Sequence, residues 1–205
     1  MVLKITTRDF VRAFFGVVIG SLFLTHRVFA HPGHDFLTFY AGFIHPFSGL
    51  DHLLAALAVG VWASGTSHKS DAFSILKTPL SFLGGILAGA FIGQVGIVLP
   101  FCEEGILLSL VLLGFGLILS IRSESSLGAL VVFLFGAFHG NAHGLEVSHR
   151  TLDGTATFGF LLSTGILHAV GIVGVSSMKR VFAEKRIILL LRFMGIGLVG
   201  SAFIL

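Results

Sequence analysis

Long apolar stretches separated by short polar links dominate the chain. Six of these stretches each approach the roughly 20 residues that a membrane-spanning helix requires. Their approximate bounds are 37–62, 80–99, 105–121, 127–146, 155–177 and 187–205. This pattern predicts an all-α membrane protein, a bundle of six transmembrane helices. The short links leave no room for a second folded domain.

The first 30 residues precede these stretches and have the features of a secretory signal peptide. A basic start is followed by a short apolar core over residues 13–24, and small or modest side chains lead up to Ala30. Cleavage after Ala30 would leave residues 31–205 as a single transmembrane domain. An uncleaved anchor helix is the alternative.

The composition agrees with a membrane protein. Hydrophobic residues make up 55% of the chain and charged residues only 11%, with a mean hydropathy of +0.99. A soluble domain carries about twice that charged fraction. The formal charge of +3 does not indicate nucleic-acid binding, because the basic residues fall in short links. Cys102 is the only cysteine, so an internal disulfide and a thiolate metal cluster are both excluded.

The distribution of basic residues predicts the orientation. If the mature N-terminus is outside, the inner links hold Lys69, Lys77, Arg122, Lys179, Arg180, Lys185 and Arg186. The outer links hold only Arg150. Because basic residues are retained on the cytoplasmic side, this bias predicts a periplasmic N-terminus if the host is a bacterium.

Ionisable residues cluster inside the first predicted span. His45 and His52 are seven residues apart, which returns to nearly the same face of a helix, and Asp51 precedes His52. Pro46 and Gly49 lie between the histidines, and a break there would expose backbone carbonyls to an ion.

A second cluster lies in the fourth predicted span. His139, His143 and Glu146 follow a four-then-three spacing that places all three on one helical face. Gly140 and Gly144 alternate with them and would permit close approach of a neighbouring helix. His168 is near the middle of the fifth predicted span.

These residues suggest a metal path. Ionisable groups inside a membrane are costly and mostly functional, and imidazole with carboxylate suits a borderline divalent metal such as nickel, cobalt or zinc. We expect a central site of Asp51, His52, His139 and His168, and an outer path of Glu146, His143 and His45. His31 and His34, near the mature N-terminus, would capture the ion. The alternative is a polar network that only holds helices together.

Two motifs, HPFSGLDH over 45–52 and FHGNAHGLE over 138–146, together with the His-rich start, resemble the HupE/UreJ family of nickel and cobalt permeases. The resemblance covers essentially the whole chain. It implies metal uptake across the bacterial inner membrane for enzymes such as hydrogenase or urease. Within the resemblance, His45, Asp51 and His52 match the first motif, His139, His143 and Glu146 match the second, and His168 and His31 match further histidines. It does not separate nickel from cobalt.

The predicted mechanism is a permease without an enzymatic activity or a resident cofactor. The chain lacks a Walker motif, so it has no ATPase of its own. Because only neutral imidazole binds metal, binding should weaken as pH falls through about 6.5. The expected partners are nickel or cobalt ions and the lipid bilayer, with an outer-membrane metal importer or a second copy as further candidates. The rival hypotheses are a membrane-embedded metal-dependent hydrolase or oxygenase, and a metal sensor or chaperone.

Overall fold

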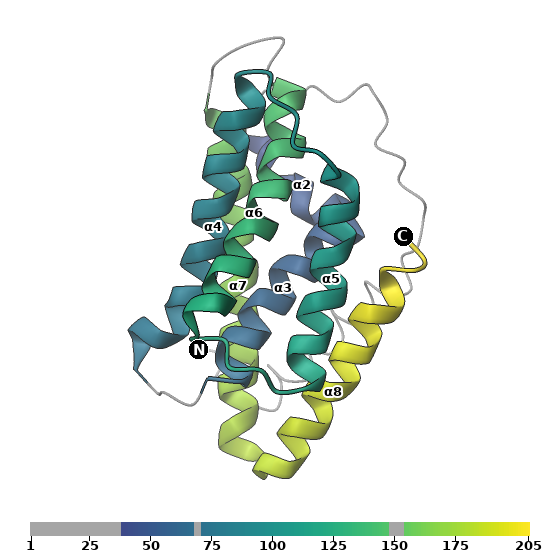
Figure 1. Cartoon of the computed structure of the whole chain (residues 1–205). Coiled ribbons are helices and arrows are strands. Elements are labelled where there is room, and N and C mark those ends of the chain that lie inside the picture. Colours follow the sequence, from purple (N-terminus) through teal and green to yellow (C-terminus); the bar gives the residue numbers. More distant parts are fainter. Residues whose placement is uncertain (1–37, 68–70, 148–153) are drawn as a thin grey trace, which may run out of the picture.

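The computed structural model describes residues 38–67, 71–147 and 154–205, and the side chains of residues 146 and 147 fall outside the described part. These residues form helices and contain no strand. The helices are α2 (Phe39–Ser48), α3 (Leu50–Gly65), α4 (Ala72–Gln94), α5 (Cys102–Ile118), α6 (Ser126–Val147), α7 (Thr155–Val181) and α8 (Glu184–Ser201). Figure 1 shows them as an elongated bundle, with α4 beside α6 and α5 beside α8.

Three of the described helices are long and apolar enough to cross a membrane: α4, α6 and α7. The pair α2 and α3 would be a fourth span if the two are counted together. Helices α5 and α8 occupy the positions of two further predicted spans, but α5 has only 17 residues and α8 carries several charged side chains. The all-α membrane character is therefore confirmed, while the count of six spans stays a prediction. The predicted signal peptide lies outside the described residues.

The first predicted span is not one straight helix. It divides at Gly49, where the backbone is extended (φ −99°, ψ 118°), and α2 and α3 meet at an angle of 84°. Thr38 caps the start of α2 by accepting a hydrogen bond from the Ala41 amide at 3.1 Å. Pro46 lies within α2 and so is not the point of the bend. The break that Pro46 and Gly49 suggested is present, and it lies at the glycine.

Glycines bring α4 and α6 into backbone contact. A Cβ atom on Gly136, Gly140 or Gly144 of α6 would overlap a carbonyl group of α4, those of Phe82, Ile86 and Ala90 respectively. Gly85 and Gly89 of α4 meet carbonyls of α6 in the same way. Small residues are what permit such close helix packing in a membrane. The predicted close neighbour of Gly140 and Gly144 is therefore α4, and the α4–α6 pair is held rigidly in register.

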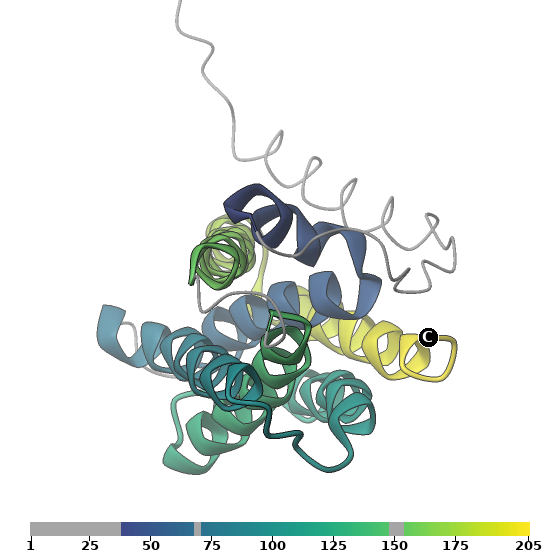
Figure 2. The same ribbon diagram turned by 90° about the horizontal axis from the view of Figure 1, so that it is seen from above.

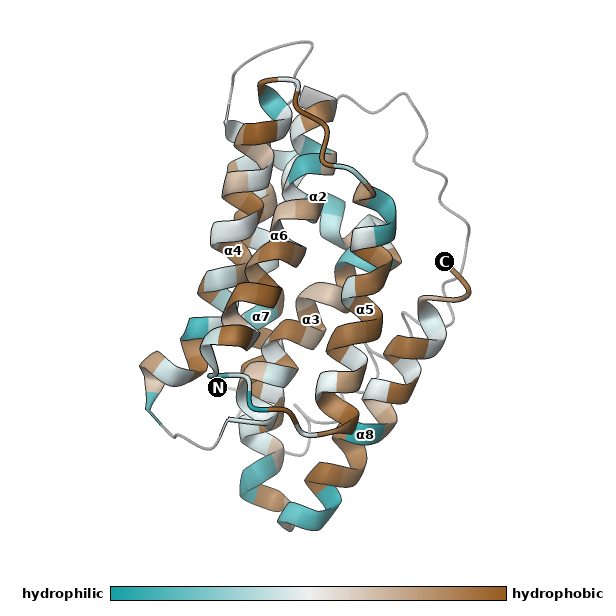
Figure 3. Ribbon diagram, viewed as in Figure 1, coloured by the Kyte–Doolittle hydropathy of each residue, from teal (hydrophilic) through white to brown (hydrophobic). Residues whose placement is uncertain are grey.

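Charged residues gather at one end of the bundle, here called the basic end. It holds Lys77, Arg122, Lys179, Arg180, Lys185 and Arg186. Figure 3 shows hydrophilic residues concentrated at the turn between α7 and α8, with hydrophobic positions along the middle of the helices. At the opposite end, Glu103 and Glu104 lie in the first turn of α5, and no Lys or Arg is present there among the described residues.

Candidate metal centre

Three histidines from three helices meet in the half of the bundle away from the basic end. His45 of α2, His52 of α3 and His143 of α6 each offer a ring nitrogen, and these nitrogens lie within 4.8 Å of one another. His52 and His143 are buried and His45 is half-buried. We call these three residues the histidine triad. In Figure 2, which looks down the bundle, α2 lies beside α7 and α3 runs through the middle of the bundle.

The bend at Gly49 brings His45 and His52 together. In a straight helix, residues seven apart are separated by about 10.5 Å along the axis. Across the bend, the ring centroids of His45 and His52 lie 5.3 Å apart. The single-helix reasoning for this pair was therefore wrong in its geometry, although the two side chains do converge. A Cβ atom at Gly49 would lie 2.9 Å from Asp51 Oδ1 and 3.2 Å from His52 Nδ1, so a side chain there would displace these two groups.

A short contact joins His52 and His143. Their Nε2 atoms are 2.7 Å apart, the distance of a hydrogen bond in which one imidazole donates and the other accepts. A metal ion held by both atoms at about 2.1 Å would need them roughly 3.0 to 3.4 Å apart. For an ion to enter, the two rings would have to separate slightly. The imidazole that donates the hydrogen bond would also have to move its proton from Nε2 to Nδ1.

Asp51 supports His52 on the other side of its ring. Asp51 Oδ1 lies 2.9 Å from His52 Nδ1, although the approach is too far off the N–H direction to count as a well-aligned hydrogen bond. A carboxylate at this position favours the tautomer with its proton on Nδ1, which leaves Nε2 free as a ligand. Asp51 therefore fits the role of an orienting group for His52.

His139 lies one helical turn from His143 on the same face of α6. Its Nδ1 is 3.0 Å from the carbonyl oxygen of Phe135, and its ring lies 4.9 Å from that of His52. The remaining nitrogen, Nε2, is buried and has no hydrogen-bond partner. Buried polar atoms are nearly always paired. A ring anchored through Nδ1 with an unpaired Nε2 is the arrangement expected of a metal ligand.

His168 lies apart from the other histidines. A Cβ atom on Gly60 of α3 would overlap the carbonyl of His168, so His168 is level with Gly60. Gly60 is eight residues beyond His52, or about 12 Å along α3 towards the basic end. Both ring nitrogens of His168 are buried without a partner. The structure does not place His168 in one central site with Asp51, His52 and His139, as the sequence led us to expect.

Two residues near the triad were not predicted from the sequence. The ring of Phe160 in α7 lies 4.6 Å from that of His143 and 6.0 Å from that of His45, so it closes the triad on one side. Asn141 accepts a hydrogen bond from the Leu99 amide at 2.9 Å and donates one to the Ile97 carbonyl at 2.8 Å. Asn141 thereby fixes the segment between α4 and α5. Its position inside the second motif was the feature of the sequence that could have identified it.

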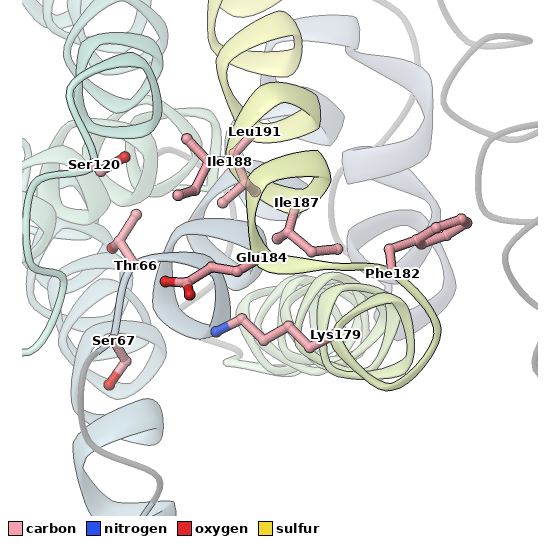
Figure 4. A pocket seen from close by; sticks show the side chains of 10 residues that line it. Thr66, Ser67, Ser120, Lys179, Phe182, Glu184, Ile187, Ile188 and Leu191 are labelled. Atoms are coloured by element: carbon pink, nitrogen blue, oxygen red, sulfur yellow. The ribbon is translucent and has the colours of Figure 1, made fainter.

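A pocket of about 360 Å³ lies at the basic end, far from the triad. Lys179 from α7 and Glu184 from α8 point towards each other across it (Figure 4). Lys179 Nζ also donates a hydrogen bond to the carbonyl of Ser64. The pocket is lined otherwise by hydroxyl groups and apolar side chains, the ring of Phe182 among them, and by no histidine.

Three of the predicted site residues are outside what the structure describes. His31 and His34 precede the described residues. Glu146 lies in the last turn of α6, but its side chain is not among those described. Their predicted roles in ion capture and in the outer path stay predictions.

Comparisons with known proteins give one consistent result. The family model described as HupE / UreJ protein matches residues 19–205. A relative named Protein HupE, from Rhizobium leguminosarum bv. viciae, is 35% identical over 161 residues, which cover 78% of this chain and 82% of that protein. No solved structure matches the chain. The matched region contains both histidine motifs and every helix described above, and the chain belongs to the HupE / UreJ family.

Proposed function

We propose that the protein is a permease that takes up nickel or cobalt ions across the bacterial inner membrane, to supply enzymes such as hydrogenase or urease. The observation that carries the proposal is the histidine triad. Three imidazoles from separate helices converge in an apolar bundle where ionisable groups are expensive unless they serve a function. The family membership, and the resemblance of its two motifs to nickel and cobalt permeases, supports the same function.

The ligand chemistry favours reversible binding. Imidazole nitrogens bind nickel and cobalt well, and the triad includes no thiolate that would hold the ion more tightly. Asp51 offsets part of the dication's charge beside His52. A site of neutral imidazoles with one nearby carboxylate can therefore accept an ion and release it, as transport requires.

The direction of transport follows from the charges. With the basic end in the cytoplasm, the triad lies in the periplasmic half of the bundle. His31 and His34 would capture the ion at the mature N-terminus, and Glu146 would pass it towards the triad. A membrane potential negative inside drives a dication inward by roughly 4.6 kcal/mol per 100 mV. This driving force needs no ATPase.

The test is uptake of radioactive nickel and cobalt by cells that lack their own importers. We expect wild-type protein to accumulate at least one of the two metals, and His52→Ala and His139→Ala to abolish uptake at equal membrane levels. His68→Ala, which alters a histidine that the sequence places in a link, is the matched control and should transport normally. Absence of uptake by wild-type protein that is verified in the membrane would contradict the proposal.

A further inference from the structure

A phenylalanine bridges the two separated groups of histidines. The ring of Phe82 in α4 lies 5.3 Å from that of His139 and 5.4 Å from that of His168. Among the described residues, no ring contact joins His168 to another histidine. A path from the triad to His168 along these side chains therefore meets Phe82. The ring is only 1% exposed, so it is fully buried between the two histidines.

The backbone of Phe82 is held by close helix packing, so an opening at this position would have to come from its side chain. Its carbonyl group is pressed against Gly136 of α6, within the close packing of α4 and α6. A shift of α4 would disturb the glycine contacts on both sides of Phe82, whereas a rotation of the ring would not. An apolar closure at Phe82 would therefore open by a change of rotamer.

Two residues of α7 in this region carry buried polar atoms that lack a hydrogen-bond partner. Thr164 is one helical turn before His168 on the same face of α7. The hydroxyl of Thr164 is buried and has no hydrogen-bond partner, and neither have the two ring nitrogens of His168. The neighbouring Ser163 differs, because its hydroxyl donates to the Phe160 carbonyl at 3.1 Å. Burying polar groups without partners is costly, which indicates that Thr164 and His168 meet a partner during function.

We propose that Thr164 and His168 form a second, inner station for the metal ion, and that the ring of Phe82 separates this station from the histidine triad. The inference rests on the proposed transport function. Two protein ligands bind an ion more weakly than the triad would, so water must complete the coordination. A weak inner station suits release towards the basic end. The closed ring prevents a continuous polar path through the bundle.

The Phe82 closure is tested with purified full-length protein in liposomes that contain a nickel-sensitive dye. Phe82→Trp enlarges the closure and should slow nickel entry about tenfold or more, which corresponds to about 1.4 kcal/mol in the barrier. Phe82→Leu reduces it and should speed entry. Nickel affinity measured by calorimetry should change little in either variant, because the triad is intact. Phe91→Trp and Phe91→Leu are the matched controls, since Phe91 is on the same helix and 66% exposed.

The inner station is tested with Thr164→Val, which keeps the shape and removes the hydroxyl. We expect slower nickel entry with an unchanged affinity at the triad, rescue by Thr164→Ser, and no effect of Ser163→Ala. If Phe82→Trp does not fold, Phe82→Leu and Thr164→Val decide the question. Entry rates equal to wild type in both of these variants would overturn the inference. If wild-type liposomes admit no nickel at all, the transport function itself is wrong, which is a different result.

Discussion

The two halves of the bundle differ in what they offer to an ion. The half with the histidine triad contains four histidines and Asp51 in tightly packed surroundings. The basic end contains the pocket of about 360 Å³, lined by Lys179 and Glu184, by hydroxyl groups and by apolar side chains. A dication needs lone pairs at short range more than it needs open volume. The half that we propose to bind the ion is therefore the one with the converging imidazoles, whereas in the pocket the Glu184 carboxylate faces the Lys179 ammonium and no histidine is present.

The largest expected effect comes from removing a member of the triad. His143→Ala deletes a nitrogen ligand and should weaken nickel binding by more than about 100-fold, beyond the usual cost of losing a supporting group. Calorimetry on the purified protein measures this. Equal affinity in the variant and the wild type would contradict the proposal that the histidine half binds the ion.

A smaller loss is expected at the group that orients His52. Asp51→Asn keeps the size of the side chain but removes its charge, which weakens the preference for the proton on Nδ1 of His52. We expect nickel affinity to fall about 10- to 100-fold, as is typical for outer-shell partners of metal ligands. Asp51→Glu should recover part of the affinity if charge matters more than placement. An unchanged affinity in Asp51→Asn would show that Asp51 has no orienting role.

The close packing of α4 against α6, which aligns the histidine half, should also be sensitive to substitution. Gly140→Val places a side chain against the Ile86 carbonyl and forces α4 and α6 apart. We expect a loss of about 1–3 kcal/mol in stability from such overpacking, seen as a lower unfolding temperature in detergent. Gly197→Val is the control, because a Cβ atom there meets nothing within 4 Å. Equal unfolding temperatures for both variants would contradict the tight α4–α6 contact.

The smallest effect is expected at the basic end. Lys179→Met removes the hydrogen bond to the Ser64 carbonyl but leaves every histidine in place. Nickel affinity should stay within about twofold of wild type, the scale of substitutions away from the functional feature. A large decrease in affinity would mean that the pocket, and not the triad, governs binding.

The sequence predicted the helical membrane fold and the residues that converge, but not how they converge. Apolar length identified the helices, and helical spacing placed His139 and His143 on one face of α6, where both rings approach that of His52. Pro46 and Gly49 indicated a break in the first span, but its 84° angle depends on how α2 and α3 pack against α7, which spacing along one helix does not encode. The same limit explains His168. Its distance from the other histidines depends on the register between α3 and α7, set by contacts such as Gly60 against the His168 carbonyl.

Phe82 and Phe160 were not distinguished by the sequence for a related reason. The chain has 22 phenylalanines, and most positions of this kind pack against lipid or core. Only the arrangement of helices around the histidines shows which of them contact an imidazole. Asn141 was different, since its position between His139 and His143 already marked it, and its hydrogen bonds to the α4–α5 segment give it a structural role.

The most direct test of the histidine triad is X-ray absorption spectroscopy of nickel bound to the purified protein. We expect scattering from several imidazole rings around the metal in the wild type, with one ring fewer in His45→Ala and in His143→Ala. A nickel ion surrounded by oxygen ligands alone, or an imidazole signal that both substitutions leave unchanged, would contradict binding at the triad.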